Sequence, residues 1–285
     1  VSETLAGLGH QVDELDLSAD LISRLEANRP DVAFIALHGT EGEDGTIQSL
    51  LELLGIPYTG PRVAACQRCM DKVLAKYVLR EHGLPTPDWV TYSEAAIRDF
   101  GAASTFGRAI ERVGLPLVAK PASQGSSLGI KVVTESERLP DALITALSYD
   151  SRALLERWVP GRELSVSVLG DQSLPIVEAI PTASHSFDFE ARYEIGGADF
   201  ICPAELPAER AEEVHRVALA AYSALHCSGF ARVDVILADE GPQILEVNAV
   251  PGLTDTSLLP QAAEAEGIPF DELVERLLEL ALEAS

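Results

Sequence analysis

Positive charge is scarce in this sequence of 285 residues. Lysines and arginines number 21 against 45 aspartates and glutamates, which gives a formal net charge of −24 at pH 7. Proteins that bind nucleic acid neutralise its phosphates with basic side chains, so this balance argues against nucleic acid as a partner. Only four of the basic residues are lysines: Lys72, Lys76, Lys120 and Lys131.

The sequence also lacks long apolar runs, a leader pattern and a cysteine framework. No stretch of 18 apolar residues occurs, and the start, VSETLAGLGHQV, lacks the zones of a signal peptide. We therefore expect a cytoplasmic protein without a membrane partner. Cys66 and Cys69 form the one close pair among four cysteines, and no second pair has the spacing of a zinc site. We interpret both as packing residues of a helix over 62–83.

Apolar periodicity predicts an α/β protein whose first domain covers residues 1–70. The run DVAFIAL (31–37) is typical of a parallel strand that is covered on both faces. An amphipathic helix is predicted over 45–55, with Gly55 at its end. Because the chain begins in a helical pattern, we expect the first strand of this open α/β domain to be missing.

Two further lobes are predicted, over 71–159 and 160–285. The first alternates strands and helices. The second opens with segments that alternate like antiparallel strands, followed by a helix over 207–226, a hairpin and terminal helices. Its segment 182–206 has no clear period, and loops of that length are usually functional.

The most informative stretch is RVDVILADEGPQILEVNAVPGLTDTS, residues 232–257. It predicts two strands, and because strand side chains alternate, Arg232 shares a face with Asp234 and Glu246 shares one with Asn248. If the two sets converge, the carboxylates and the amide supply hard oxygen ligands for one or two Mg²⁺ ions, with room for phosphates. The alternative is a strand face in solvent. The strongly apolar flanks argue against it, because buried carboxylates need cations.

A second candidate site lies in LVAKPASQGSSLGI. A strand delivers Lys120, and the Gly- and Ser-rich loop after it carries Ser126 and Ser127, whose hydroxyls and amides can cradle phosphate. The lysine precedes the glycines, so this is not the P-loop pattern. A flexible hairpin is the alternative interpretation.

Two weaker candidates complete the set. The segment LLERWVPGRE can offer backbone groups and carboxylates to a nucleotide, or it can be an ordinary linker. His38 ends the predicted parallel strand, where open α/β sheets place their ligands. A purely structural loop, with Asp44 as a helix cap, explains the region around His38 equally well.

Together these motifs resemble the D-alanine–D-alanine ligases of the ATP-grasp superfamily. The resemblance rests on ALHGTEGEDGTIQSLLELLGIPYTG, MDK, KPASQGSSLGI, RVDV and LEVNAVPGLTDTSLLP, which follow one another along nearly the whole chain. It implies an ATP-grasp fold in which the lobes 71–159 and 160–285 clasp ATP, beside a truncated N-terminal substrate domain. It further implies ATP-dependent ligation of two D-alanines through an acylphosphate, for peptidoglycan precursor synthesis, by a homodimer.

The resemblance also assigns the residues that would bind ATP and metal. The ATP-binding residues would be Lys72, Lys120, Ser127, Glu156, Trp158, Val159 and Glu163. Two Mg²⁺ ions, with Mn²⁺ as an alternative, would be held by Asp234, Glu246 and Asn248.

The remaining assignments concern the reacting groups. Arg232 and the amide of Gly252 would face the tetrahedral intermediate, and Ser126 and Tyr193 would join the phosphate loop to a lid over 182–206. Ser257 and Leu258 would hold the second D-alanine, His38 would lie near the first, and Arg192 would also belong to the substrate-binding residues. Arg192 stands where the family has lysine, which keeps the charge but changes its geometry.

Two alternatives stay open. The nearest is a D-alanine–D-lactate ligase. The other is an ATP-binding pseudoenzyme or sensor without the first-substrate site, because the family's first strand and its glycine-rich loop have no counterpart in the sequence.

Overall fold

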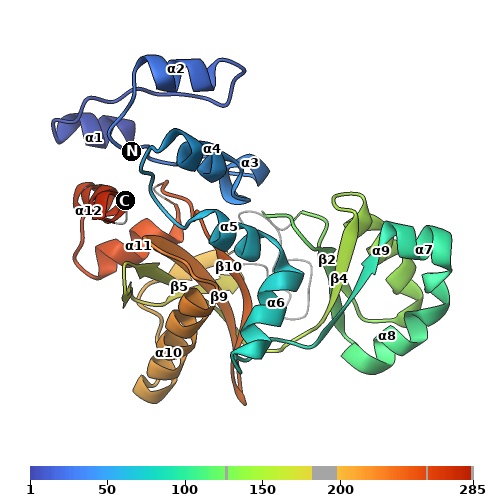
Figure 1. Cartoon of the computed structure of the whole chain (residues 1–285). Coiled ribbons are helices and arrows are strands. Elements are labelled where there is room, and N and C mark those ends of the chain that lie inside the picture. The colour runs from blue at the N-terminus through green and yellow to red at the C-terminus, as the bar shows by residue number, and fades with distance from the viewer. Residues whose placement is uncertain (126–127, 182–197, 255, 284–285) are drawn as a thin grey trace.

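The computed structural model describes residues 1–125, 128–181, 198–254 and 256–283. Two antiparallel sheets dominate it, and helices cover the sheets on several sides (Figure 1). No helix in the described ranges is long and apolar enough to cross a membrane.

The N-terminal part of the chain consists of short helices joined by loops. They are α1 (Ser2–Gly7), α2 (Leu21–Ala27), α3 (Thr40–Glu43) and α4 (Thr46–Leu54). The predicted helix end is confirmed, since Gly55 follows α4 with a left-handed φ of 64°. The chain also begins in a helix as expected, and Leu5 of α1 is buried against Val274 and Leu278 near the C-terminus.

The predicted parallel strand over 31–37 is wrong. Among the described residues, this segment makes only an isolated parallel bridge between Ala33 and Tyr58. The amide of Ala33 donates to the carbonyl of Pro57 at 2.8 Å. The next amide on that edge belongs to Ile35, and it donates a hydrogen bond to the side-chain Oγ1 of Thr59 at 2.9 Å. That side-chain bond replaces the backbone bond that would extend the ladder, and ladders define strands.

The single helix predicted over 62–83 is also wrong. The structure has α5 (Val63–Met70) and α6 (Lys72–Glu81), with Asp71 in an extended conformation between them. Asp71 Oδ1 accepts hydrogen bonds from the amides of Val73 and Leu74 at 3.0 and 3.1 Å. An aspartate that satisfies the first free amides is a favoured helix N-cap, so Asp71 starts a new helix rather than continuing the old one.

The smaller sheet has the strand order β1-β4-β2-β3 and is antiparallel throughout. Its strands are β1 (Trp89–Ser93), β2 (Leu117–Pro121), β3 (Lys131–Val133) and β4 (Arg152–Arg157). Around it lie α7 (Glu94–Phe100), α8 (Phe106–Val113), α9 (Leu139–Leu147) and the 3₁₀ turns η1 (Ala102–Thr105) and η2 (Ser136–Arg138). Leu117, Ala119 and Leu155 face these helices in one core cluster. The alternation of strand side chains turns Lys120 and Glu156 to the other face.

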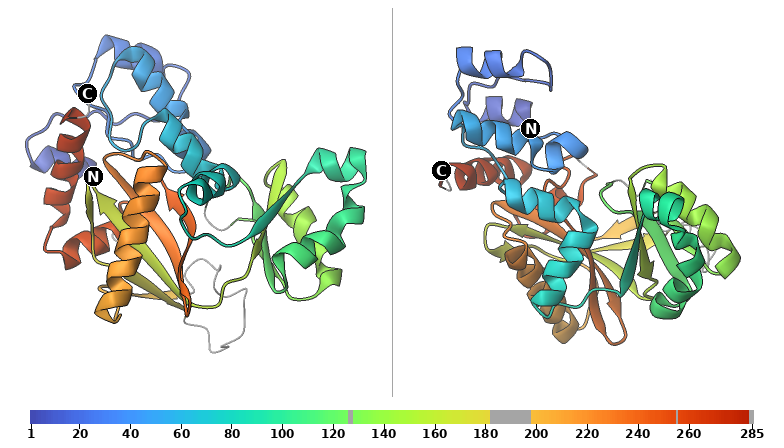
Figure 2. Two further views of the ribbon diagram at one scale, coloured as in Figure 1. Left: turned by 60° about the horizontal axis from the view of Figure 1, so that its bottom comes forward. Right: turned by 45° about the vertical axis from the view of Figure 1, so that its right-hand side comes forward.

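The larger sheet has the order β10-β9-β5-β7-β8, and β6 pairs with β5. Its strands are β5 (Arg162–Leu169), β6 (Gln172–Ser173), β7 (Val177–Pro181), β8 (Ala198–Ile201), β9 (Phe230–Ala238) and β10 (Gly241–Asn248). The helices of this region are α10 (Ala208–Ala224), α11 (Leu258–Ala265) and α12 (Phe270–Glu283) (Figure 2). The helix predicted over 207–226 and the predicted hairpin are both confirmed.

The helices α5 and α6 pack with the larger sheet. Cys69 of α5 and Leu79 of α6 belong to the same buried cluster as Val233 and Val247 of the hairpin. The N-terminus of α6 also reaches the smaller sheet, because the amide of Lys72 donates to the carbonyl of Ala122 at 2.9 Å. The division into units 1–70, 71–159 and 160–285 stays a prediction, but α6 clearly contacts both sheets.

Candidate active site

The hairpin of β9 and β10 presents its four polar side chains on one face, as predicted. Glu246 is the register partner of Asp234, and Asn248 is the partner of Arg232. Cross-strand partners lie on the same side of a sheet, so all four share a face. A bulge between Ile244 and Glu246 sets this alternation: Ile244 and Val247 enter the apolar core, while Glu246 and Asn248 point away from it.

Asp234 is held by three neighbours. The Nε and Nη2 atoms of Arg232 donate to its two oxygens, each at 2.8 Å. Asn248 Nδ2 donates to Oδ2 at 2.8 Å, and Ser165 Oγ donates to Oδ1 at 2.7 Å. Burial opposes the charge on Arg232, but the attraction of Asp234 outweighs it and raises the pKa of the guanidinium. Arg232 therefore carries a fixed positive charge at this face.

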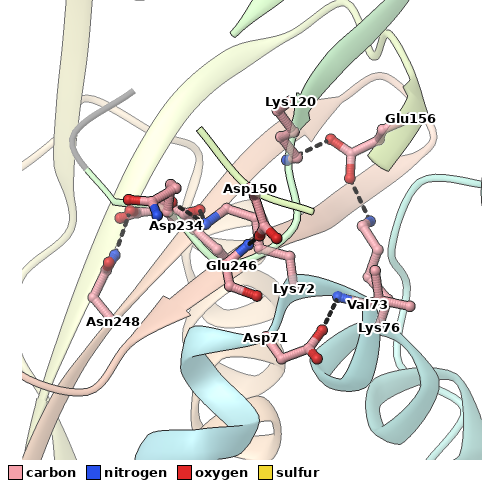
Figure 3. A network of polar contacts seen from close by, with 12 residues as sticks. Asp71, Lys72, Val73, Lys76, Lys120, Asp150, Glu156, Asp234, Glu246 and Asn248 are labelled. Carbon is pink, nitrogen blue, oxygen red and sulfur yellow. Dashed lines mark hydrogen bonds and ion pairs between the residues drawn. The ribbon is translucent and has the colours of Figure 1, made fainter. Parts of the chain in front are cut away.

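Glu246 faces the N-terminus of α6. Lys72 Nζ lies 3.1 Å from Glu246 Oε2 and also donates to the carbonyl of Gln124 at 2.7 Å (Figure 3). Burial opposes ionisation of Glu246, yet the charges of Lys72 and Lys120 prevail and lower its pKa to about 2. A pocket opens here, and its lining residues are Glu43, Cys69, Met70, Lys72, Gln124, Gly125, Glu246, Val247, Asn248 and Ala249.

The donor set of the hairpin fits a magnesium site. Among the described residues, no three His, Cys, Asp or Glu side chains gather as a metal site. The hairpin instead offers the carboxylates of Asp234 and Glu246 together with the amide of Asn248. Mg²⁺ usually takes one or two protein carboxylates and completes its shell with water and substrate phosphates, so two carboxylates suffice.

Lys120 enters the site from β2 and is almost fully buried. Its Nζ donates to Glu156 Oε1 at 3.0 Å, and the other oxygen of Glu156 lies 2.5 Å from Nζ of Lys76 (Figure 3). Sequence reasoning missed Lys76, and its only signal there was the rarity of lysine. Ser126 and Ser127 of the predicted phosphate loop lie outside the described residues. The amide of Ser123, just before them, is anchored by Asp150 Oδ2 at 2.7 Å.

The predicted adenine contacts lie where β4 leads into β5. The carboxylate of Glu156 is paired with the ammonium groups of Lys76 and Lys120. A contact with adenine would therefore use the backbone of this region rather than that carboxylate. Trp158 and Val159 follow on the connecting segment, both half-buried. Glu163 lies in β5, where its register partners are Ala179 and Ile236.

Gly252 lies close to Ser257 and also to His38, which is distant from both in sequence. A Cβ atom on Gly252 would lie 2.5 Å from Ser257 Oγ and 3.9 Å from His38 Cε1, so a side chain at Gly252 would displace the serine. Ser257 precedes α11, and Leu258, the first residue of that helix, packs against a buried cluster. Arg192 and Tyr193 lie outside the described residues.

Glu43 is a further residue of the site that the sequence interpretation missed. Its Oε1 accepts from the amide of Gly39 at 3.0 Å and lies 3.7 Å from Nδ1 of His38. Its charge also helps to raise the pKa of Arg232. The sequence interpretation named Asp44 instead, as a possible helix cap. The amide of Thr46 does donate a hydrogen bond to Asp44 Oδ1 at 2.8 Å, as that alternative predicted. The signal for Glu43 was its place in HGTEGEDGT.

Cys66 and Cys69 are buried, with 0% and 5% of their surfaces exposed, in agreement with a packing role. The structure brings Cys69 close to a different cysteine, since its Sγ lies 3.5 Å from Sγ of Cys227. All four cysteines are free thiols.

Comparison with known proteins gives matches along nearly the whole chain. Residues 78–279 match the family described as D-ala D-ala ligase C-terminus, and residues 10–61 match D-ala D-ala ligase N-terminus. The chain is 42% identical to the D-alanine–D-alanine ligase of Moorella thermoacetica, covering 99% of this chain and 92% of that protein.

Solved structures agree with the sequence matches. The D-alanine–D-alanine ligase of Bacillus anthracis superposes with a TM-score of 0.83 at 36% identity, covering 99% of this chain and 91% of that one. Its complex with ATP gives a TM-score of 0.78 at 37% identity, over 93% and 83% of the two chains. The VanG D-Ala:D-Ser ligase of Enterococcus faecalis also gives 0.78, at 32% identity over 88% and 73%. The predicted ATP-grasp fold is confirmed, and this chain belongs to the D-alanine–D-alanine ligase family.

Proposed function

We propose that this protein joins two D-alanine molecules into D-alanyl-D-alanine and converts one ATP to ADP and phosphate in doing so. The observation that carries the proposal is that the positive charges of Lys72, Lys120 and Arg232 gather around Glu246, the hairpin carboxylate that lines the pocket. A second support is that relatives 41–43% identical over nearly the whole chain bear the name of this ligase. The product would serve as a peptidoglycan precursor.

The nucleotide phosphates belong beside the two lysines. Lys72 and Lys120 reach the same region from α6 and β2, and both approach Glu246 closely enough to lower its pKa. A lysine ammonium is a compact point charge that suits phosphate oxygens. Catalysis of phosphoryl transfer is mostly positioning and charge stabilisation, which this arrangement can provide.

The reaction proceeds in two displacements. The carboxylate of the first D-alanine attacks the γ-phosphorus of ATP, forming an acylphosphate and releasing ADP. The amine of the second D-alanine attacks the acyl carbon, and inorganic phosphate leaves as the peptide bond forms. Arg232, held by Asp234, stabilises the negative charge that develops on the oxygen of the attacked acyl carbon, as preorganised donors do.

We assign Asp234, Glu246 and Asn248 to Mg²⁺, in two sites that Mn²⁺ can also occupy. The bound cations would supply positive charge to the phosphates of ATP. In this chain, Arg232 and Lys72 already neutralise the two carboxylates. Lys72, which lies 3.1 Å from Glu246 Oε2, would be available to a phosphate if Glu246 held a cation instead.

Ser257 and Leu258 would hold the second D-alanine, and His38, which like Ser257 lies close to Gly252, would lie near the first. The backbone amide of Gly252 would face the tetrahedral intermediate, and the lack of a side chain at this residue leaves room for the hydroxyl of Ser257. Oε1 of Glu43 lies 3.7 Å from Nδ1 of His38. Arg192 and Tyr193 complete this proposal from the sequence alone.

We further propose a cytoplasmic homodimer. Use of ATP and synthesis of a precursor inside the cell support the location, and the family resemblance supports the dimer. Sedimentation velocity at micromolar protein concentration tests the assembly, because a single species of the monomer mass would contradict it.

The decisive experiment supplies ATP, Mg²⁺ and D-alanine and follows both phosphate release and the dipeptide by mass spectrometry. We expect D-alanyl-D-alanine in a one-to-one ratio with phosphate. Competition with equimolar D-lactate and D-serine tests acceptor choice, since abundant D-alanyl-D-lactate at pH 7 would favour the alternative ligase. ATP binding without any phosphate release would instead support the pseudoenzyme.

A further inference from the structure

A buried charge cluster lies behind the predicted phosphate site. It consists of Lys76, Lys120 and Glu156, whose side chains are 1%, 6% and 3% exposed. Buried charges are costly unless they are paired, and here one carboxylate is shared between two ammonium groups. Lys76 takes no part in the two displacements, although it is the more deeply buried of the two lysines.

The contacts of Lys76 join separate parts of the chain. Its Nζ lies 2.5 Å from Oε2 of Glu156 on β4. It also donates to Oγ1 of Thr86 at 2.6 Å and to the carbonyl of Pro87 at 3.3 Å. The ring of Trp89 lies beside it, with its centroid 5.4 Å from Nζ.

Through Thr86 the same network reaches the strand that carries the oxygen ligands. Thr86 Oγ1 donates to the carbonyl of Ile244 at 2.9 Å, and the amide of Ile244 donates to the carbonyl of Pro85 at 2.9 Å. Ile244 lies at the bulge that directs Glu246 to the polar face. Lys76 is therefore tied to Lys120 through Glu156 and to the Glu246 strand through Thr86.

The charge balance explains why a second lysine is needed. A pair of Lys120 and Glu156 alone would be neutral, and the carboxylate would hold the ammonium with both oxygens. With the Lys76 ammonium at Oε2, two positive charges face one carboxylate, so the cluster has a net charge of +1. Lys120 is then held through Oε1 alone. That arrangement leaves the remaining hydrogens of the Lys120 ammonium available to an anion.

We propose that Lys76 is a positioning residue for ATP: it fixes Glu156, which in turn sets the place and the available charge of Lys120. This inference rests on the proposed function, because it takes Lys120 to be a phosphate ligand. Lys76 does not touch the nucleotide itself. Its contribution is to ATP affinity rather than to D-alanine affinity.

The test compares Lys76→Met with Lys131→Met, the same chemical change on the same lobe. Lys131 is an exposed residue whose register partner is Ala119, so its side chain points to the sheet face opposite Lys120. We expect Lys76→Met to raise the KM for ATP and the Kd of Mg-ATP at least about tenfold, while the KM for D-alanine changes less than about twofold. Lys131→Met is expected to leave all three constants within about twofold.

A double-mutant cycle shows whether Lys76 acts through Glu156. In a Glu156→Gln background, Lys76→Met is expected to weaken Mg-ATP binding by less than about twofold further, since residues that act as one unit are not additive. Lys76→Gln, which keeps a donor for Thr86, serves as the second variant if Lys76→Met is poorly folded. A merely structural role would reduce the active fraction and leave both KM values unchanged.

The outcomes separate this inference from the function on which it rests. If Lys120→Met leaves the Kd of Mg-ATP unchanged, the phosphate assignment itself fails. If Lys120→Met weakens binding but folded Lys76→Met and Lys76→Gln do not, only the positioning role of Lys76 is overturned. Equal rises in the KM for ATP and for D-alanine would also overturn it.

Discussion

The two charged clusters of the site differ in how they meet solvent. The lysine–glutamate cluster beside the smaller sheet is closed, with side chains no more than 6% exposed. The hairpin cluster of the larger sheet is open, since 16% of Asp234, 21% of Arg232 and 29% of Glu246 is exposed. The closed cluster holds the carboxylate of Glu156 between two lysines and sets the position of Lys120. The open cluster can exchange its partners for ions and phosphates.

The two clusters show that charge alone does not identify a binding group. Glu156 and Glu246 are both carboxylates held by lysines, and in both cases the lysines overcome the effect of burial and lower the pKa. Only Glu246 lines the pocket. We therefore expect substitutions in the closed cluster to act mainly on stability and ATP affinity, and those in the open cluster to act on turnover.

The largest effect is expected from breaking the closed cluster. Glu156→Gln leaves the ammonium groups of Lys76 and Lys120 facing each other without a counter-charge. Removing one partner of a buried ion pair should lower the free energy of unfolding by about 3–5 kcal/mol. Urea unfolding at pH 7 measures this. The control is Glu94→Gln, which removes an exposed ion pair with Arg98 and should cost less than about 0.5 kcal/mol. Equal losses for the two variants would contradict the comparison.

The second prediction concerns the open cluster. Glu246→Gln removes one carboxylate from the proposed metal sites and should reduce ligase turnover about a hundredfold at physiological Mg²⁺. The variant also leaves Lys72, whose side chain is only 9% exposed, without its counter-charge, so far-UV circular dichroism checks that the variant is folded. A variant with more than about a tenth of the parent rate would overturn the two-metal assignment.

Asp71 is linked to both clusters because it caps α6, the helix that carries Lys72 beside Glu246 and Lys76 beside Glu156. Its Oδ1 caps α6, and its Oδ2 accepts from Arg152 Nη2 at 2.7 Å. Asp71→Ala should lower the free energy of unfolding by about 1–2 kcal/mol, as loss of an N-cap does. Asp71→Asn keeps a capping oxygen and should recover most of that loss. Thermal unfolding of the three proteins decides this, and equal losses in both variants would show that the cap is unimportant.

The smallest effect is expected from a titratable group outside both clusters. His215 of α10 has a buried Nδ1 with no hydrogen-bond partner among the described residues, and burial lowers its pKa below 6.5. The unfolded state then binds the proton more readily, so stability falls as pH drops below 6.5. His215→Gln should flatten this dependence slightly between pH 7 and pH 5 in urea unfolding curves. An unchanged slope would show that other groups dominate it.

The sequence by itself determined the local elements and the face of the hairpin. Strand alternation placed Arg232 with Asp234 and Glu246 with Asn248, and helical periodicity with Gly55 located α4. These patterns are local, because a side chain's direction follows from its position in a strand or helix. The motifs likewise identified the family, since their order along the chain is written in the sequence.

Tertiary structure alone decided the pairing of charges and the limits of two elements. Lys76 lies 2.5 Å from Glu156, and His38 lies close to Gly252, across distances in sequence that no local period spans. The run over 31–37 is apolar enough for a strand, but a strand also needs a neighbour, and Thr59 takes the amide that would extend the ladder. The break between α5 and α6 is supported by two contacts with the smaller sheet. Arg152 of β4 donates to the side chain of Asp71, and the carbonyl of Ala122, just after β2, accepts from the amide of Lys72. Each of these outcomes depends on a partner that only the folded chain brings near.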